Sequence, residues 1–346
     1  AASDVYKRQA LVHVSGTVTG AEVHSLAAAG FSDKVDFTNT TIGTLGAADA
    51  VYAAGHGASG LVVSDSAAHI IEEGVSLASL YAMSEPGESY DYDEVSAFAE
   101  IHVTGAVTPS QLDLLKGLSA ENGLTVDLTG AVTVAGLTVE EATYAHANGE
   151  QLGTISDSAA ALLAGDANAI SAATGIFVVP TGDAPVTTNE ELVSLSESGF
   201  AHQVNLVGAE LVSDLSVAGA TYAHAQGGNY SALAISDSAA QVLSGNAGVL
   251  SDAASVAVTG VVSASDVAGL SSRPYAGLVD LSATSLEGEL TVAEATYAHA
   301  QSGDISGLTV VDGAGAVLAG NAAALSSAAL VHVSGTVTGA EVHSLS

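Results

Sequence analysis

The sequence lacks cysteine and tryptophan entirely, and only 4% of its 346 residues are aromatic. Without cysteine, a disulfide scaffold and any thiolate-ligated zinc site are excluded. Apolar residues nevertheless make up 48% of the chain, so its core must be filled mainly by Ala, Val, Leu and Ile. Such small side chains predict a thin, regular core built from repeated units rather than one large globular centre.

Basic residues are also scarce, with 5 Lys and Arg against 38 Asp and Glu and a formal net charge of −33. This charge repels nucleic acid and anionic membrane surfaces, and it makes cations the natural partners. No window approaches about 18 uninterrupted apolar residues, so no membrane-spanning segment is predicted. Calcium at millimolar concentration is expected to bridge such acidic molecules.

Repeats dominate what is present. The sixteen residues LVHVSGTVTGAEVHSL occupy positions 11–26 and return unchanged at 330–345, which indicates internal duplication. Shorter motifs recur between them: TYAHA at 143–147, 221–225 and 296–300, and SDSAA at 64–68, 156–160 and 236–240. The sequence therefore predicts successive copies of one larger unit.

These motifs define the expected organisation of the chain. Residues 1–10 resemble a translated cloning adapter and are set aside as a non-native leader. The predicted repeat units are 11–100 with an acidic insertion at 84–100, then 101–175, 176–255, 256–329, and the start of a further repeat at 330–346.

Short patterns such as VHVSG and VDLTG, apolar at alternate positions, predict strands with one covered and one open face. They recur on average about every 27 residues, the length of one strand and one short helix. Thr followed three residues later by Glu or Gln predicts helix starts at five places, Thr19, Thr108, Thr138, Thr291 and Thr338. We therefore predict an α/β repeat solenoid of about twelve strand-helix coils, with a parallel sheet on one face and short Ala-rich helices on the other.

The VTG and SDSAA segments resemble the repeat tracts of giant bacterial surface and secreted adhesin-like proteins. The resemblance covers nearly all of residues 11–345, although His69-Ile70 and its counterparts stand where the family pattern has Asn-Ile. It implies an exported, structural or adhesive protein at the bacterial surface, and no reaction.

Aligning the strands places one residue of each on the open face, with Val62 expected beside His102 and Thr309 beside His332. Neighbouring strands lie about 4.8 Å apart, so we expect His13 beside Asp36 and His102 beside Asp127. Such pairs are either pH-sensitive ion pairs, two ligands of a metal site, or solvated pairs that favour the register. The Tyr or the His of each TYAHA motif is expected to pack in the helix layer.

Two sets of carboxylates have separate predicted roles. The insertion concentrates acids that suit calcium, namely Glu85, Glu88, Asp91, Asp93 and Glu94. Four aspartates follow a strand and precede an Ala-rich helix, and we expect them to cap helix amides: Asp65, Asp157, Asp237 and Asp312.

The repeated ends predict a filament formed by stacking of coils, either as tandem copies in one giant chain or as head-to-tail subunits. The predicted polymer interface comprises Leu11, Val12, Val14, Leu330, Val331 and Val333. An adhesion module that binds glycans or a cell surface is the alternative, and a polysaccharide lyase a more distant one. Nucleophile-elbow, zinc-protease and phosphate-loop motifs are missing, so no enzyme activity is predicted.

Overall fold

The structure is a computed structural model that describes residues 12–29, 34–73, 97–122, 125–133, 136–180, 186–212 and 214–345. The chain divides into two compact units. Unit one contains residues 1–157 and 164–176, and unit two contains residues 158–163 and 177–346.

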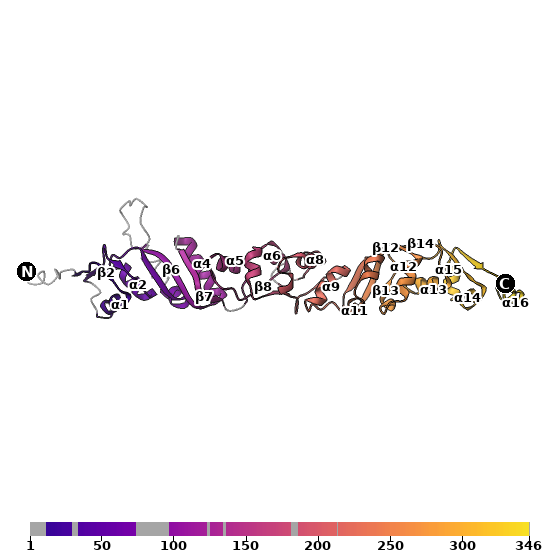
Figure 1. Cartoon of the computed structure of the whole chain (residues 1–346), viewed down its shortest axis with the longest axis horizontal. Helices are drawn as coiled ribbons and strands as arrows, with labels where there is room; N and C mark the ends of the chain where they lie inside the picture. Colours follow the sequence, from indigo (N-terminus) through magenta and orange to yellow (C-terminus); the bar gives the residue numbers. More distant parts are fainter. Residues whose placement is uncertain are drawn as a thin grey trace, which may run out of the picture. The chain divides into compact units, whose positions relative to one another are not determined.

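The elements of unit one are β1 (Val12–His13), β2 (Thr17–Val18), α1 (Gly20–Ala28), β3 (Val35–Asp36), β4 (Thr41–Ile42), α2 (Ala47–Ala54), β5 (Leu61–Ser66), β6 (Phe98–Val107), α4 (Pro109–Asn122), β7 (Thr125–Thr133), α5 (Val139–Ala147), β8 (Thr154–Asp157) and α7 (Ala167–Ala172). Its strands pair in parallel, β1 with β3, β2 with β4, and β5, β6 and β7 in that order (Figure 1).

The elements of unit two are α8 (Asn189–Glu197), η1 (Ala201–Gln203), β10 (Val204–Asn205), α9 (Val217–Ala225), β11 (Ala234–Ser238), α10 (Ala239–Ser244), α11 (Ala247–Asp252), β12 (Ser255–Ser263), α12 (Ala264–Ser271), η2 (Ala276–Leu278), β13 (Val279–Asp280), β14 (Thr284–Glu287), α13 (Val292–Ala300), β15 (Thr309–Gly313), α14 (Ala314–Ala319), α15 (Ala322–Ser327), β16 (Leu330–Ser334) and α16 (Gly339–Leu345). The division between the units runs through α6 (Ala159–Ala164) and β9 (Gly175–Val178).

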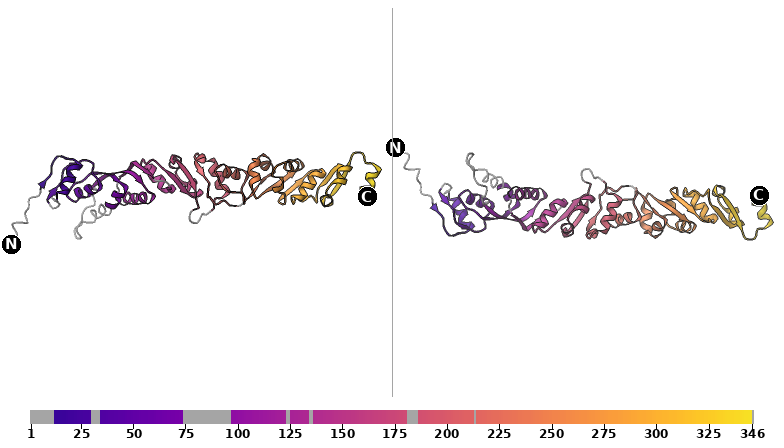
Figure 2. Two further views of the ribbon diagram at one scale, coloured as in Figure 1. Left: turned by 90° about the horizontal axis from the view of Figure 1, so that it is seen from below. Right: turned by 90° about the horizontal axis from the view of Figure 1, so that it is seen from above.

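Parallel pairing also holds unit two together. β12 lies between β11 and β13 and pairs further along with β14, while β15 pairs with β16. In both views of Figure 2 the colours within each unit follow the sequence order, because strands pair with near neighbours in the chain. The prediction of an α/β chain with parallel sheets is thereby confirmed.

The alternating strand patterns produce the two expected faces. In β7 Val126 and the following Leu128 are buried while Asp127 between them is only half-buried, and β13 repeats this with Val279 and Asp280. Successive side chains of a strand point to opposite faces, so the apolar residues pack under the helices and the polar ones face outward.

The glycine of the V-T-G motif bends the long strands. Gly105 in β6 and Gly260 in β12 both have a φ of +79°, a backbone region that side chains with a Cβ atom rarely adopt. Val256 and Ala257, before the bend, pair with β13, and the residues from Gly260 onward pair with β14. The motif thus lets one strand bind two successive partners.

Helix starts follow the predicted capping boxes. In each box the side-chain oxygen of the first residue accepts the amide three residues on, and the acid or amide side chain accepts the first residue's amide. The predicted boxes begin at Thr19, Thr108, Thr138, Thr291 and Thr338. Two more, which the sequence analysis missed, begin at Thr188 and Ser263.

The strands β5 and β15 pair with their neighbours β6 and β16 in a register that differs from the expectation. His102 pairs with Ser64 rather than Val62, and His332 pairs with Val311 rather than Thr309, a shift of two residues. Because two residues restore the same face of a strand, the open face keeps its side. The shift places the Asp of the S-D-S segment level with the start of a neighbouring helix.

None of the helices in the described ranges has the length and apolarity that crossing a lipid bilayer demands.

Candidate functional site

The open sheet face of unit one carries the first His-Asp pair. His13 of β1 lies directly opposite Asp36 of β3, and the His13 Nδ1 atom is 2.9 Å from Asp36 Oδ2. The other carboxylate oxygen accepts the amide of Thr38 at 2.8 Å and its hydroxyl at 2.6 Å. The Thr38 hydroxyl and amide, followed by His13, lower the pKa of Asp36.

A second pair repeats this geometry on β6 and β7. His102 lies opposite Asp127, with 2.7 Å between His102 Nδ1 and Asp127 Oδ2. The amide of Thr129 donates to Asp127 Oδ1 at 2.9 Å. Hydrogen bonds from Thr129, and to a smaller extent His102, lower the pKa of Asp127. The structure therefore brings together both pairs that the strand register predicted.

The carboxylates of these pairs have a local structural role that recurs without histidine. Asn205 and Asp280 occupy the same place in unit two, and each accepts the amide two residues further on, at 2.8 and 2.9 Å. Opposite Asp280 stands Ala257 instead of His. The Asp or Asn thus stabilises the turn after the strand, and the histidine is a separate addition in unit one.

His102 has a further neighbour that the sequence analysis assigned to the acidic insertion. Its Nε2 atom is 3.3 Å from Glu100 Oε2, and Glu100, His102 and Asp127 form a group whose ligand atoms lie within 4.8 Å of one another. Glu100 belongs to β6, which begins at Phe98. Glu100 lies two positions before His102, on the same face of the strand, and that spacing was the signal that could have identified it.

The residues predicted to bind calcium are separate from this group. Its five residues, Glu85, Glu88, Asp91, Asp93 and Glu94, lie outside the described residues, which resume at 97.

The four predicted caps do bind helix amides, but of a different helix from the one expected. Asp65, Asp157, Asp237 and Asp312 accept the first amide of α2, α5, α9 and α13 at 3.1, 3.0, 3.1 and 3.2 Å. Each of these helices precedes its aspartate in the chain. The helix after Asp237 is capped instead by the next residue, because Ser238 Oγ accepts the Gln241 amide, whereas Gly313 after Asp312 forms no side-chain cap.

Strand pairing explains this correction. Leu215, just before α9, forms a parallel bridge with Ile235, which lies two residues before Asp237. Leu45 and Leu290 form the equivalent bridges with Val63 and Val310. The first helix amide is therefore held against the carboxylate of the neighbouring strand, so each aspartate joins one strand-helix module to the next.

Tyr222 and Tyr297 of the TYAHA motifs are packing residues in this structure, whereas His146 and His224 are exposed. The hydroxyl groups of Tyr222 and Tyr297 donate to the carbonyl oxygens of Ala201 and Ala276, each at 3.1 Å. Burial raises the pKa of both tyrosines to about 12. The two hydroxyl hydrogen bonds hold each helix against the turn that precedes it.

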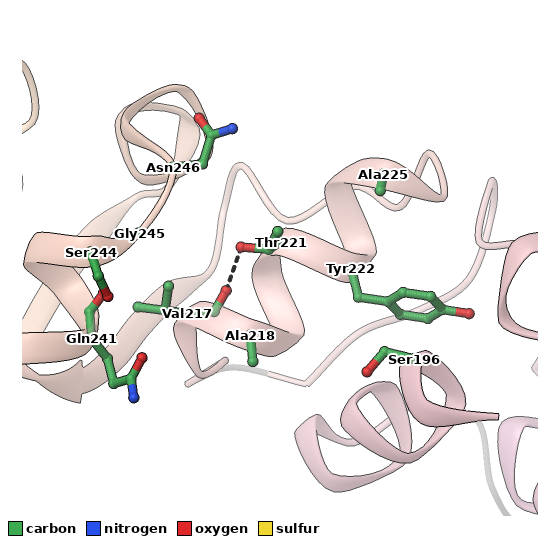
Figure 3. Close-up of a pocket in the computed structure, with 10 residues that line it drawn as sticks. All are labelled: Ser196, Val217, Ala218, Thr221, Tyr222, Ala225, Gln241, Ser244, Gly245 and Asn246. Atoms are coloured by element: carbon green, nitrogen blue, oxygen red, sulfur yellow. Dashed lines mark hydrogen bonds between the residues drawn. The ribbon is translucent and has the colours of Figure 1, made fainter.

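A shallow open groove crosses α9, α10 and the turn before α11 (Figure 3). Its polar groups bind backbone atoms, since the Thr221 hydroxyl donates to Val217 O at 2.7 Å and the Ser244 hydroxyl to Gln241 O at 3.1 Å. A Cβ atom on Gly245 would lie 2.8 Å from a Val217 methyl group. The groove reflects close packing of helices, and Figure 3 shows the Tyr222 ring extending away from Gln241.

The predicted polymer interface lies at strand edges. Leu11 is outside the described residues, whereas Val12 is 53% exposed on β1 and Leu330 is 57% exposed on β16. Val14, Val331 and Val333 are half-buried. Among the described strands β1 pairs with β3 alone and β16 with β15 alone, so each keeps one free edge.

No protein-family model, curated protein or solved structure matches this chain.

Proposed function

We propose that this chain is a structural repeat protein of the bacterial surface whose strand-helix modules stack as an α/β solenoid of about twelve coils and continue into a filament. One observation carries the proposal. The same sixteen residues occur as copy one (11–26) and copy two (330–345), and each copy packs against a neighbour on the opposite side from the other.

In copy one, β1 pairs with the module that comes after it in the chain, and Val23 of α1 is fully buried. In copy two, β16 pairs with the module that precedes it, and the equivalent Val342 of α16 is 57% exposed. Together the two environments describe one complete interior module. If copy two can accept the same neighbour that copy one already has, residues 11–329 form a block that can be repeated without end.

The edge of β3 that pairs with β1 determines how two blocks can be joined. Copy one already occupies that edge in its own chain, so copy two of one molecule could reach β3 of the next molecule only by displacing copy one. Separate molecules could stack without displacement where the free edge of β16 meets the free edge of β1, which would place the two copies next to each other. Tandem copies in one chain continue the same order of modules with no displacement and no doubled module, which favours tandem repeats over separate subunits.

Electron microscopy of the protein from its native source tests the proposal, with the mass of the denatured chain determined alongside. We expect uniform fibres with an axial repeat of about 58 Å, twelve modules at the strand spacing of about 4.8 Å. A mass of several blocks supports the tandem version, and a mass of one block supports subunits. Discrete monomeric particles from intact native material would contradict the filament.

An extended chain offers a sharper test. Residues 27–73, which come directly after copy one, are appended after Leu345 in place of Ser346. We expect amide hydrogen exchange in α16 to slow to the rate of α1, because the appended module covers Val342. The matched control carries Val35→Asp within the appended segment, since Val35 is buried beside β1. Equal exchange in both extended chains would mean that copy two does not accept this module.

The net charge of −33 predicts how such fibres interact. Like charges keep fibres apart until cations screen or bridge them. Fibres should bundle on addition of millimolar calcium and separate on chelation, and unchanged fibre spacing would count against this. A glycan-binding adhesion module is the competing class, and binding lost on deletion of residues 84–97 from a monomeric protein would favour it.

A further inference from the structure

We propose that Glu100 and His102 are the ligands of a zinc site on the open face of β6, with Asp127 orienting the histidine. Both ligands lie on one face of the strand because side chains alternate. Asp127 comes from β7, directly opposite His102. The site is independent of the filament proposal.

The two nitrogens of His102 face two different carboxylates. Nδ1 is 2.7 Å from Asp127 Oδ2, within the range of a strong hydrogen bond, whereas Nε2 is 3.3 Å from Glu100 Oε2. A neutral imidazole carries a single N–H group. With that proton donated to Asp127, the Nε2 lone pair points toward a carboxylate oxygen, and a cation between them makes the contact favourable.

The distance between His102 Nε2 and Glu100 Oε2 fits a zinc ion bound to both atoms. Two ligand atoms that each lie about 2.0–2.1 Å from a tetrahedral zinc ion are about 3.3 Å apart. The hydrogen bond to Asp127 matches the carboxylate-histidine-metal arrangement in which an outer carboxylate fixes the tautomer. The remaining coordination positions are open, because His102 and Glu100 are 35% and 40% exposed. Water or a ligand from another molecule would fill them.

The chain contains its own comparison for this site. His13 and Asp36 repeat the contact between Nδ1 and the carboxylate at 2.9 Å, but the residue two before His13 is Leu11. Copy two likewise has Leu330 before His332. The glutamate therefore distinguishes the module of β6 from the otherwise similar one of β1.

Isothermal titration of the full chain with zinc chloride tests the proposal. Wild type should show one site above the background of weak surface carboxylates. Glu100→Leu and His102→Ala should each weaken that site at least about tenfold, while His13→Ala leaves it unchanged; Asp127→Asn should weaken it about 10 to 100-fold, the range for outer-shell partners. Circular dichroism verifies folding, and Glu100→Leu introduces the residue found at this place in both copies.

Cobalt substitution gives a second readout. Co²⁺ bound through His102 should give visible absorption bands that disappear in His102→Ala and Glu100→Leu and persist in His13→Ala. Zinc isotherms that are the same in wild type and Glu100→Leu would overturn the proposal, as would equal losses in His13→Ala and His102→Ala. Either result would make the cluster an ion pair of a protonated histidine.

Discussion

Copy one and copy two have identical sequences and share the capping box at the start of the helix, yet they differ in burial. Thr19 and Thr338 each accept the amide three residues on, at 3.4 and 3.3 Å. The threonine amide and hydroxyl lower the pKa of Glu22 in one copy and of Glu341 in the other. The helix start is therefore encoded within the sixteen residues and is independent of the neighbouring modules.

Burial is supplied by the neighbouring module. Val23 is 0% exposed because α1 packs against α2, whereas Val342 of α16 is 57% exposed. The same contrast holds for the strands, since β1 and β16 present opposite free edges. In this architecture a module carries its own secondary structure, and adjacent modules create the core between them.

Truncating the equivalent valines should have the largest and most unequal effect. Val23→Ala should lower the unfolding free energy of unit one by about 2 kcal/mol, since it leaves a cavity between packed helices. Val342→Ala should change stability by less than about 0.5 kcal/mol, as for other exposed positions. Urea unfolding, combined with hydrogen exchange of α1 and α16, measures both. Equal losses would show that α16 is already covered.

Removing an aspartate cap tests a hydrogen bond between two modules, and removing the serine cap beside it tests a hydrogen bond within one module. Asp237→Ala should cost about 1 kcal/mol and increase hydrogen exchange in α9, whose first amide it accepts. Ser238→Ala, the matched control, should instead increase exchange in α10, which comes directly after it. Faster exchange confined to α10 in both variants would contradict the link between modules.

The sequence predicted features that depend on a few neighbouring residues. Capping boxes and the alternation around Asp127 are local patterns, and parallel pairing followed from their repetition. The aspartate caps were assigned to the wrong helix because the S-D-S strands are shifted by two residues, and both registers expose the same side chains. Glu100 was missed because the acidic composition of 84–100 concealed the start of a strand.

Glu150 allows a further comparison between repeats. It stands just after the first TYAHA helix at a place where the other two repeats have Gly228 and Gly303. Its side chain is buried, one oxygen accepts the Thr133 hydroxyl at 2.5 Å, and the other lacks a hydrogen-bond partner among the described residues. Burial raises the pKa of Glu150, an effect that the Thr133 hydrogen bond reduces.

The sign of the pH effect is set by that shift. A raised pKa in the folded state means that Glu150 contributes stability below its ordinary pKa of 4.5 and loses it as pH rises through the higher folded value. Glu150→Gln should therefore increase the unfolding free energy by about 0.5–1 kcal/mol at neutral pH. Urea unfolding across pH should show the gain disappear on acidification, and a gain that grows below the ordinary pKa would contradict the assignment.

The smallest effect concerns the first His-Asp pair, which only copy one completes. Because the Thr38 hydroxyl contributes more than His13 to the lowered pKa of Asp36, Thr38→Ala should raise that pKa more than His13→Ala does. The contribution of Asp36 to stability is present above its ordinary pKa and is lost as pH falls through the lowered value. Carboxyl ¹³C NMR titration measures each variant, with His332→Ala as the control because no described carboxylate lies opposite His332. A larger shift in His13→Ala would mean that the histidine, and not the turn, keeps Asp36 ionised, and the pair would then differ in kind from Asn205 and Asp280.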